Sequence, residues 1–270
     1  MNYLQYQLKI DDVQKVRERL VNFTKNAVKK TGFKKAVVGL SGGIDSSLVA
    51  YILAEALGSQ NVYGIYMPYA DNTNRYAELV AQTLHIHFKE INIYSMINTY
   101  FILVPTDDVL RKGNKMARER MSILYDFAKL FDAVVIGTSN KTEILLGYGT
   151  IFGDLAWLIN PIGDLYKTFV KQMAVEYNIP DMIINRKPSA ELWEGQFDED
   201  ELGFTYEDVD KLLFLMFERH YSIKELLQIG FAKDFIDNVL SLIRKNKFKR
   251  SQPLICRFSN YYNYLSILKQ

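Results

Sequence analysis

The sequence has a single cysteine, and this scarcity sets the first limits on the protein. Cys256 has no second cysteine with which to form an internal disulfide, and the count excludes a cysteine-rich zinc site. A lone cysteine is typical of proteins that work in a reducing compartment. We therefore expect a cytoplasmic protein in which Cys256 is a partly buried structural residue.

The chain also lacks a long apolar run and an excess of charge of either sign. No apolar stretch approaches the ~20 residues that span a bilayer, and the first residues lack the pattern of a signal peptide. The 33 basic and 31 acidic residues leave a net charge of +2, which gives no broad basic surface for nucleic acid. Neither a membrane nor a nucleic acid is an expected partner.

What the sequence does have is enough apolar residues for one large core. Of its 270 residues 49% are hydrophobic and 24% are charged, which is ordinary for a globular protein. Strands expected at 36–40, 61–67, 88–93 and 133–137 alternate with helices, of which the longest are expected at 11–30 and 114–130. This alternation predicts an α/β fold, a doubly wound parallel sheet with helices on both faces.

The second half of the chain is expected to be mainly helical. A helix is predicted at 167–177, and the stretch 206–248 is predicted to form a helical C-terminal part. Residues 185–203 are polar and acidic, and we expect them to form a long functional loop without an element of its own. We find no linker, so residues 1–270 are expected to form one domain.

The most informative motif is Ser41-Gly42-Gly43-Ile44-Asp45-Ser46, placed between a predicted strand and a predicted helix. Two glycines allow backbone N–H groups to face outward, and a helix start attracts anions, so this loop suits a phosphate. It has no lysine and is therefore not a Walker loop. A carboxylate at Asp45 makes sense if it holds a divalent cation that the phosphates also bind.

Other candidate residues follow later strands. The loops after residues 40, 67 and 136 are expected to converge at the carboxyl ends of the strands. Thr138 is placed to bond a phosphate, ribose or base, and Glu143 offers a second metal carboxylate, although residues 138–140 also suit a helix cap. Lys167 is placed to neutralise charge on a departing phosphate. Arg118 lies in a helix that, taken alone, reads as a solvated basic surface.

These motifs carry a resemblance at two levels. The loop at 41–46 resembles the pyrophosphate-binding loop of the N-type ATP pyrophosphatases. The segments Asn114–Met121, Lys187–Trp193 and Asp198–Gly203 narrow the resemblance to NAD synthetases of the short, ammonia-dependent bacterial type, from the loop to Pro253. The resemblance implies a Rossmann-like fold of the adenine nucleotide alpha hydrolase type and a homodimer. It also implies amidation of deamido-NAD with ammonia and ATP through an acyl adenylate, with release of AMP and pyrophosphate.

The resemblance also implies the residues of each site. It gives Asp45 and Lys167 a catalytic role and assigns Mg²⁺ to Asp45 and Glu143. The implied ATP-binding residues are Gly39, Leu40, Ser41, Gly42, Gly43, Ile44, Asp45, Ser46, Thr138, Lys167 and Ser189. The implied deamido-NAD-binding residues are Arg118, Tyr148, Asp154 and Lys249. Ile151, Leu158 and Phe248 depart from the family pattern of lysine, aspartate and histidine, and these departures all fall on the dinucleotide side.

Two alternatives remain open from the sequence. One is another N-type ATP pyrophosphatase, similar to GMP synthetase or to a tRNA-modifying enzyme. The other is a nucleotide-binding module without catalysis, although a binder needs no paired metal carboxylates. For the homodimer, the aromatic-rich helices near 94–101 and 125–131 are candidate contacts, while aromatic residues of this kind more often belong to a core.

Overall fold

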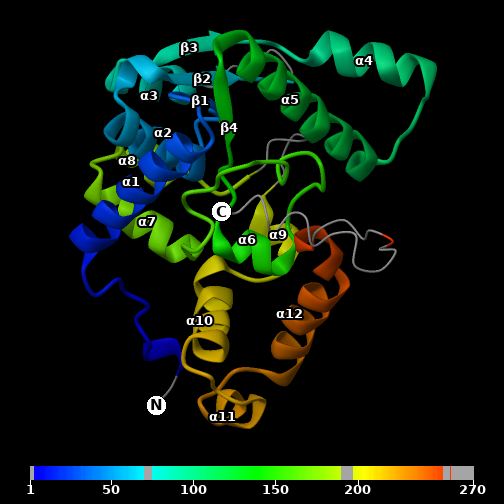
Figure 1. Ribbon diagram of the computed structural model, residues 1–270. Coiled ribbons are helices and arrows are strands. Elements are labelled where there is room, and N and C mark those ends of the chain that lie inside the picture. Colours follow the sequence, from blue (N-terminus) through cyan, green and yellow to red (C-terminus); the bar gives the residue numbers. More distant parts are fainter. Residues whose placement is uncertain (1–2, 70–74, 190–196, 252–255, 257–270) are drawn as a thin grey trace.

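A parallel sheet of four strands in the order β3-β2-β1-β4 forms the upper layer of the molecule in Figure 1. The computed structural model describes residues 3–69, 75–189, 197–251 and 256. The strands are β1 (Lys35–Gly39), β2 (Val62–Tyr66), β3 (His87–Glu90) and β4 (Ala133–Ile136). Because β1 pairs with β2 on one side and β4 on the other, its carboxyl end lies at the point where the strand order reverses. The predicted doubly wound sheet is confirmed.

Helices cover both faces of the sheet because alternate side chains of each strand face opposite ways. In β1, Ala36 and Val38 belong to one core cluster and Val37 to another, and all three are fully buried. The first cluster draws on α1 (Val13–Lys30), α2 (Ile44–Leu57), α3 (Tyr76–Leu84), α7 (Lys167–Glu176) and α8 (Asp181–Ile184). The second draws on α4 (Tyr94–Leu103) and α5 (Val109–Phe131).

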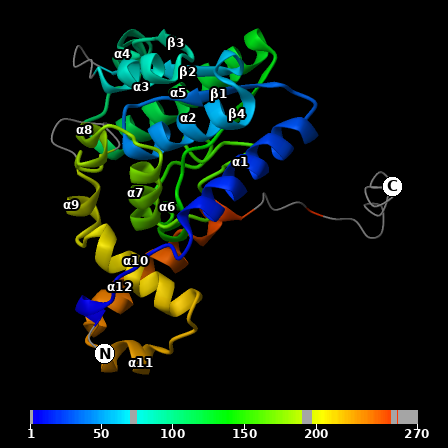
Figure 2. The same ribbon diagram turned by 90° about the vertical axis from the view of Figure 1, so that its left-hand side faces the viewer.

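A separate helical layer lies below the sheet in Figure 2 and has its own apolar core. It contains α6 (Lys141–Leu146), α9 (Asp198–Leu202), α10 (Tyr206–Phe217), α11 (Ile223–Gln228) and α12 (Lys233–Lys245). Short 3-10 turns complete the elements at η1 (Tyr3–Gln5), η2 (Ser59–Asn61) and η3 (Lys247–Arg250). The ring of Tyr3 stacks on Phe231 at 4.0 Å between centroids, which joins the first residues of the chain to this layer. The predicted helical C-terminal part is confirmed.

Several local expectations differ from the structure. Helix α5 begins at Val109, before the predicted residue 114, because Asp108 caps it by accepting a hydrogen bond from the Arg111 N–H at 3.0 Å. Helix α9 lies within 185–203, where no element was expected. Cys256 is exposed, so the expectation of partial burial is wrong. Within the described part of the chain, none of the helices has the length and apolar character needed to cross a bilayer.

Candidate active site

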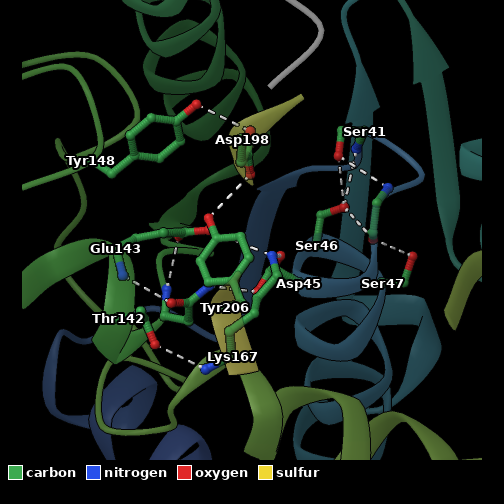
Figure 3. A network of polar contacts seen from close by, with 12 residues as sticks. Ser41, Asp45, Ser46, Ser47, Thr142, Glu143, Tyr148, Lys167, Asp198 and Tyr206 are labelled. Carbon is green, nitrogen blue, oxygen red and sulfur yellow. Dashed lines mark hydrogen bonds and ion pairs between the residues drawn. The ribbon is translucent and has the colours of Figure 1, made fainter. Parts of the chain in front are cut away.

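The loop between β1 and α2 is folded by the hydroxyl groups of its own serines (Figure 3). Ser46 Oγ accepts a hydrogen bond from the Ser41 N–H at 3.2 Å and donates one to the Gly43 carbonyl at 3.1 Å. Ser47 Oγ donates to the same carbonyl at 2.8 Å. Gly42 has a φ of 79°, a conformation that favours glycine. Helix α2 begins after Gly43 without a side-chain cap, which is the arrangement that helix starts use to bind anions.

Lys167, the first residue of α7, contacts two carboxylates from different elements. Its Nζ lies 2.5 Å from Asp45 Oδ2 in α2 and 3.6 Å from Glu143 Oε1 in α6. The lysine side chain is only 3% exposed, and the carboxylates of Asp45 and Glu143 are 18% and 17% exposed. The structure therefore brings together the residues that were predicted to act in catalysis and those predicted to bind a metal.

Burial and charge together set the protonation of this cluster. Burial raises the pKa of Glu143 to about 8, and repulsion from Asp45 acts in the same direction, while Lys167 opposes both. Burial by itself would lower the pKa of Lys167, but attraction to Asp45 and Glu143 outweighs it and holds this pKa above its usual value. Lys167 is therefore charged at neutral pH, and Glu143 releases its proton only at a higher pH than an exposed glutamate does.

Asn140 both caps a helix and holds the phosphate-loop carboxylate. Its side-chain oxygen accepts from the Glu143 N–H at 3.0 Å, and Glu143 Oε2 accepts from the Asn140 N–H at 3.1 Å, which makes a capping box. Asn140 Nδ2 also donates to Asp45 Oδ1 at 3.0 Å. The cap that the sequence left open as an alternative is confirmed at Asn140. It also fixes Glu143, with one oxygen toward the cap and the other toward Lys167.

Two tyrosine hydroxyls meet on a buried aspartate beside this cluster (Figure 3). Asp198, at the start of α9, accepts from Tyr148 at 3.1 Å and from Tyr206 at 3.1 Å, one on each carboxylate oxygen. The ring centroid of Tyr206 lies 5.0 Å from Lys167 Nζ. Asp198 was not predicted as a site residue because the acidic run 198–201 resembles a solvated surface. Its place in a family motif was the only signal that marked it.

The turn that carries Tyr148 is supported from the end of the described chain. Lys249 Nζ donates to the carbonyl oxygens of Gly147 and Gly149, both at 2.8 Å, so it spans the turn on either side of Tyr148. Gly147 has a φ of 65°, and a Cβ added there would lie 2.2 Å from Asn246 Cβ. Two of the predicted deamido-NAD residues, Tyr148 and Lys249, are therefore held together.

The other two predicted deamido-NAD residues lie on the continuation of this turn. Arg118 Nε donates to the Ile151 carbonyl at 3.3 Å. Asp154 accepts from the Thr150 N–H at 2.7 Å, which closes the loop back on itself. Arg118 is an exposed side chain of α5, so the two ends of this contact come from the sheet layer and from the loop. All four residues thus gather around 147–154.

Two of the three residues that depart from the family pattern, Ile151 and Phe248, lie next to the predicted deamido-NAD residues in the chain. Ile151 holds Arg118 with its backbone carbonyl, and a residue of any type at this position has such a carbonyl. The side chains of Leu158 and Phe248 are 63% and 58% exposed, so their apolar character is presented to solvent in this structure.

Three further predicted ATP residues lie at separate points of the chain. Leu40 is fully buried, and its N–H donates to the Ile65 carbonyl at 2.9 Å, so its side chain has no access to a ligand. Thr138 is half-buried directly after β4, and Ser189 is half-buried just before residues 190–196, which lie outside the described part of the chain.

The donor set suits a cation that is completed by phosphate oxygens. Over residues 3–69, 75–189, 197–251 and 256, no group of three His, Cys, Asp or Glu side chains is arranged to hold a metal by itself. Asp45 and Glu143 do approach a single cation, the Lys167 ammonium, from two elements. Since Mg²⁺ is usually bound by one or two carboxylates with substrate phosphates and water, two such groups are sufficient.

Comparisons of sequence and structure agree with one another. The family model described as NAD synthase matches residues 16–253. The NH(3)-dependent NAD(+) synthetase of Trichlorobacter lovleyi is 48% identical over 247 residues, which are 90% of each chain. The solved NH3-dependent NAD synthetase of Campylobacter jejuni has a TM-score of 0.78 at 34% identity and covers 91% of this chain and 100% of that one. The NMN synthetase of Francisella tularensis has a TM-score of 0.81 at 28% identity, with coverages of 92% and 100%.

Proposed function

The chain belongs to the NAD synthase family, and on that premise we propose that it makes NAD from deamido-NAD, ATP and ammonia. A carboxylate does not react with ammonia directly, because oxide would have to leave. The nicotinate carboxylate therefore attacks the α-phosphate of ATP, which forms an acyl adenylate and releases pyrophosphate. Ammonia then attacks the acyl carbon, AMP leaves with the bonding electrons, and the amide remains after loss of a proton.

The observation that carries this proposal is the meeting of Asp45, Glu143 and Lys167 beside the glycine loop, in a chain of this family. The loop N–H groups at the start of α2 bind the pyrophosphate end of ATP. Lys167, charged and buried, stabilises the negative charge that grows on the leaving pyrophosphate. A protein nucleophile is not required by this reaction, since the substrate carboxylate is the nucleophile.

We assign Mg²⁺ to Asp45 and Glu143, with the phosphates of ATP as its other ligands. Support comes from the way both carboxylates already face one cation. When bound, the ion screens the repulsion between the anionic nucleophile and the triphosphate. The chain's own contribution is to hold the two carboxylates at the end of the phosphate loop, through the contact from Asn140 to Asp45 and through the capping box that fixes Glu143.

The other contacts are assigned from the resemblance to the NAD synthase family. The ATP contacts are Gly39, Leu40, Ser41, Gly42, Gly43, Ile44, Ser46, Thr138 and Ser189. The deamido-NAD contacts are Arg118, Tyr148, Asp154 and Lys249. Tyr148 connects the two groups, because its hydroxyl bonds Asp198, which also holds the Tyr206 ring against Lys167.

One assay tests the reaction. Purified protein is incubated with ATP, Mg²⁺, ammonium and deamido-NAD, and the products are separated by chromatography. We expect NAD, AMP and pyrophosphate in equal amounts. Formation of ADP, or the absence of NAD while another carboxylate is consumed, contradicts the proposal.

A second acceptor belongs in the same assay because of the likeness to an NMN synthetase. That enzyme's product is the mononucleotide amide, so the acid form of the mononucleotide is supplied in place of deamido-NAD. We expect the dinucleotide to give the higher kcat/KM, since the relative from Trichlorobacter lovleyi at 48% identity is an NAD synthetase. A preference for the mononucleotide would reassign the substrate and leave the ATP chemistry unchanged.

The assembly that we propose is a homodimer that uses the outer surface of α4 and α5. Helix α4 is mainly apolar and aromatic, yet Ile97 is its only buried residue. Ile102 and Leu103 are 68% and 77% exposed, and Leu110 at the start of α5 is 61% exposed. Exposed apolar side chains gathered in this way are typical of an interface between proteins. The cytoplasmic location and the single domain over 1–270 stay predictions.

A further inference from the structure

Helix α7 begins without a cap of its own. The residue at its N-cap position, Tyr166, makes no side-chain hydrogen bond to the helix. The first N–H groups of a helix have no acceptor within the helix. Here the Lys167 N–H donates to Thr142 Oγ1 in α6 at 3.0 Å, and the Thr168 N–H donates to Asp210 Oδ2 in α10 at 2.7 Å. The start of α7 is therefore capped from two other helices.

Asp210 joins these three helices through both of its carboxylate oxygens. Thr142 Oγ1 donates to Oδ1 at 2.5 Å, and Thr168 Oγ1 donates to Oδ2 at 2.8 Å, in addition to the Thr168 N–H. Asp210 and Thr142 are both fully buried. A buried carboxylate is tolerated when donors satisfy it, and the positive end of the α7 dipole adds to the attraction.

The two threonines that contact Asp210 are each the sequence neighbour of a residue that we place in the reaction. Thr168 follows Lys167 in α7, and Thr142 precedes Glu143 in α6. The carboxylate thus fixes the backbone from which the Lys167 ammonium and the Glu143 carboxylate extend. With no exposed surface, Asp210 itself has no access to a substrate.

We infer that Asp210 is a positioning residue, which holds Lys167 and Glu143 in register for the departure of pyrophosphate. The inference rests on the proposed function. A displacement of about 1 Å in a group that stabilises a transition state costs about 100-fold in rate. Asp210 also stabilises the fold as any satisfied buried carboxylate does. The two roles can be told apart: a positioning residue changes kcat through Lys167, whereas a residue that only stabilises the fold does not.

The test compares Asp210→Asn with Asp208→Asn on the same helix. Asparagine keeps the shape of Asp210 and one acceptor oxygen but loses the charge and the second acceptor. We expect kcat for NAD formation to fall about 10- to 100-fold, while KM for deamido-NAD changes by less than about twofold. Asp208 is half-buried, and its side chain accepts from the Thr205 hydroxyl at the helix start, away from α6 and α7, so Asp208→Asn is expected to keep the wild-type kcat.

A double-mutant cycle with Lys167 separates positioning from stability. Lys167→Arg keeps a positive charge, and hence measurable turnover, in a side chain of different geometry. If Asp210 acts through Lys167, the fold-loss caused by Asp210→Asn shrinks to near 1 in the Lys167→Arg background. Equal fold-losses in both backgrounds, or wild-type kcat in Asp210→Asn, overturn the inference. Urea unfolding of every variant confirms that the assayed protein is folded.

If Asp210→Asn does not fold, Thr142→Val replaces it in the same cycle. Valine removes the hydroxyl that accepts from the Lys167 N–H and donates to Asp210, with little change of volume. The same shrinking of the kcat effect in the Lys167→Arg background is expected, and equal effects again overturn the inference.

Wild-type protein in the same assay separates the proposed function from the proposed role of Asp210. No NAD from the wild type refutes the proposed function, whereas NAD from the wild type with unaffected variants refutes only the role of Asp210.

Discussion

At the scale of single residues, the candidate active site consists of charges that the fold removes from water. A lysine that is 3% exposed is stable as an ammonium because Asp45 and Glu143 face it. Loss of one partner from a buried ion pair usually leaves an uncompensated charge. Here a second carboxylate stands beside the pair, and its pKa is raised by burial and by repulsion from the charge of Asp45.

The presence of this second carboxylate leads to a prediction for Asp45→Asn. The amide removes the repulsion, so the pKa of Glu143 falls and its carboxylate pairs with Lys167 in place of Asp45. We expect the free energy of unfolding in urea to change by less than about 1 kcal/mol, within the range of mild substitutions, while kcat falls about 100-fold or more. Asp108→Asn at the cap of α5 serves as the control, because asparagine caps a helix as well as aspartate does. Near-wild-type turnover at limiting Mg²⁺ would exclude Asp45 from the metal site.

The pKa of Glu143 also predicts how stability depends on pH. In the folded, ligand-free protein this pKa is about 8, above the ordinary value of 4.5. Between these values the folded state retains a proton that the unfolded chain releases, so the free energy of unfolding falls as the pH rises. One pKa unit corresponds to about 1.4 kcal/mol, which sets the upper limit of the slope for each pH unit.

Urea unfolding at several pH values from 5 to 8 measures this effect. Glu143→Gln cannot ionise, so its stability is expected to decline less over this range than that of the wild type. The difference between the two proteins isolates Glu143 from other groups, such as Asp210, whose pKa burial raises to about 6. Parallel stability curves for the two proteins would contradict the raised pKa.

At the scale of elements, the short helix α6 connects the two halves of the candidate active site. Its N-terminal cap, Asn140, contacts the phosphate-loop carboxylate, and Glu143 faces Lys167. Its C-cap residue, Gly147, leads into the turn that Lys249 supports. A change at either end of α6 therefore reaches both the triphosphate side and the dinucleotide side.

Gly147→Ala tests the packing at the end of α6. The positive φ of 65° strains any side chain, and the new Cβ would meet Asn246 Cβ at 2.2 Å. We expect a loss of about 2 to 5 kcal/mol in the free energy of unfolding, from strain and overpacking together. Gly32→Ala is the matched control, with a φ of 83° but nothing within 4 Å of the added Cβ, so only the strain remains. Equal losses of unfolding free energy in the two variants would show that Asn246 moves aside without a cost in stability.

Local patterns predicted most of the elements, and the misses have physical causes. Strands β1, β2 and β4 were predictable because they are short, mainly apolar runs, whereas β3 (His87–Glu90) is mainly polar and was predicted at 88–93. The start of α5 was missed because charged residues and Gly113 interrupt its periodicity, although Asp108 was present as a cap signal. Helix α9 has five residues of which four are acidic, so it has no apolar face that a pattern could reveal. The polar stretch 71–74 predicts a helix cap, but it lies outside the described residues, and the N-cap position of α3 is Arg75.

Only those site residues that stand in a recognisable local motif could be predicted from the sequence. The glycine loop, Glu143 and Lys167 stand in motifs, and the topology of a parallel sheet indicated that they converge. The roles of Asp198 and Asp210 depend on partners elsewhere in the chain, and no local pattern distinguishes them from surface acids. The fold confirmed the convergence, while the role of each residue stays a prediction.

At the scale of the whole molecule, the exposed apolar surface of α4 and α5 predicts association. Ile102→Lys together with Leu103→Glu places charges where the partner subunit would pack, so we expect monomers in sedimentation velocity and a loss of activity. Leu4→Glu is the control, because Leu4 is also 63% exposed but lies in η1, at the other end of the molecule. A wild-type protein that sediments as a monomer while fully active would contradict the dimer.

The separation of the contacting groups along the chain has a consequence for how activity is acquired during folding. Asp45 meets Asn140 across 95 residues and Lys167 across 122, and Lys249 meets Gly147 and Gly149 across 102 and 100. Contacts between distant residues form slowly, because long loops must close before any favourable contact is made. During synthesis the phosphate loop leaves the ribosome first and remains without its lysine until about half of the chain has followed. We therefore expect nucleotide chemistry to be among the last properties that a refolding chain recovers.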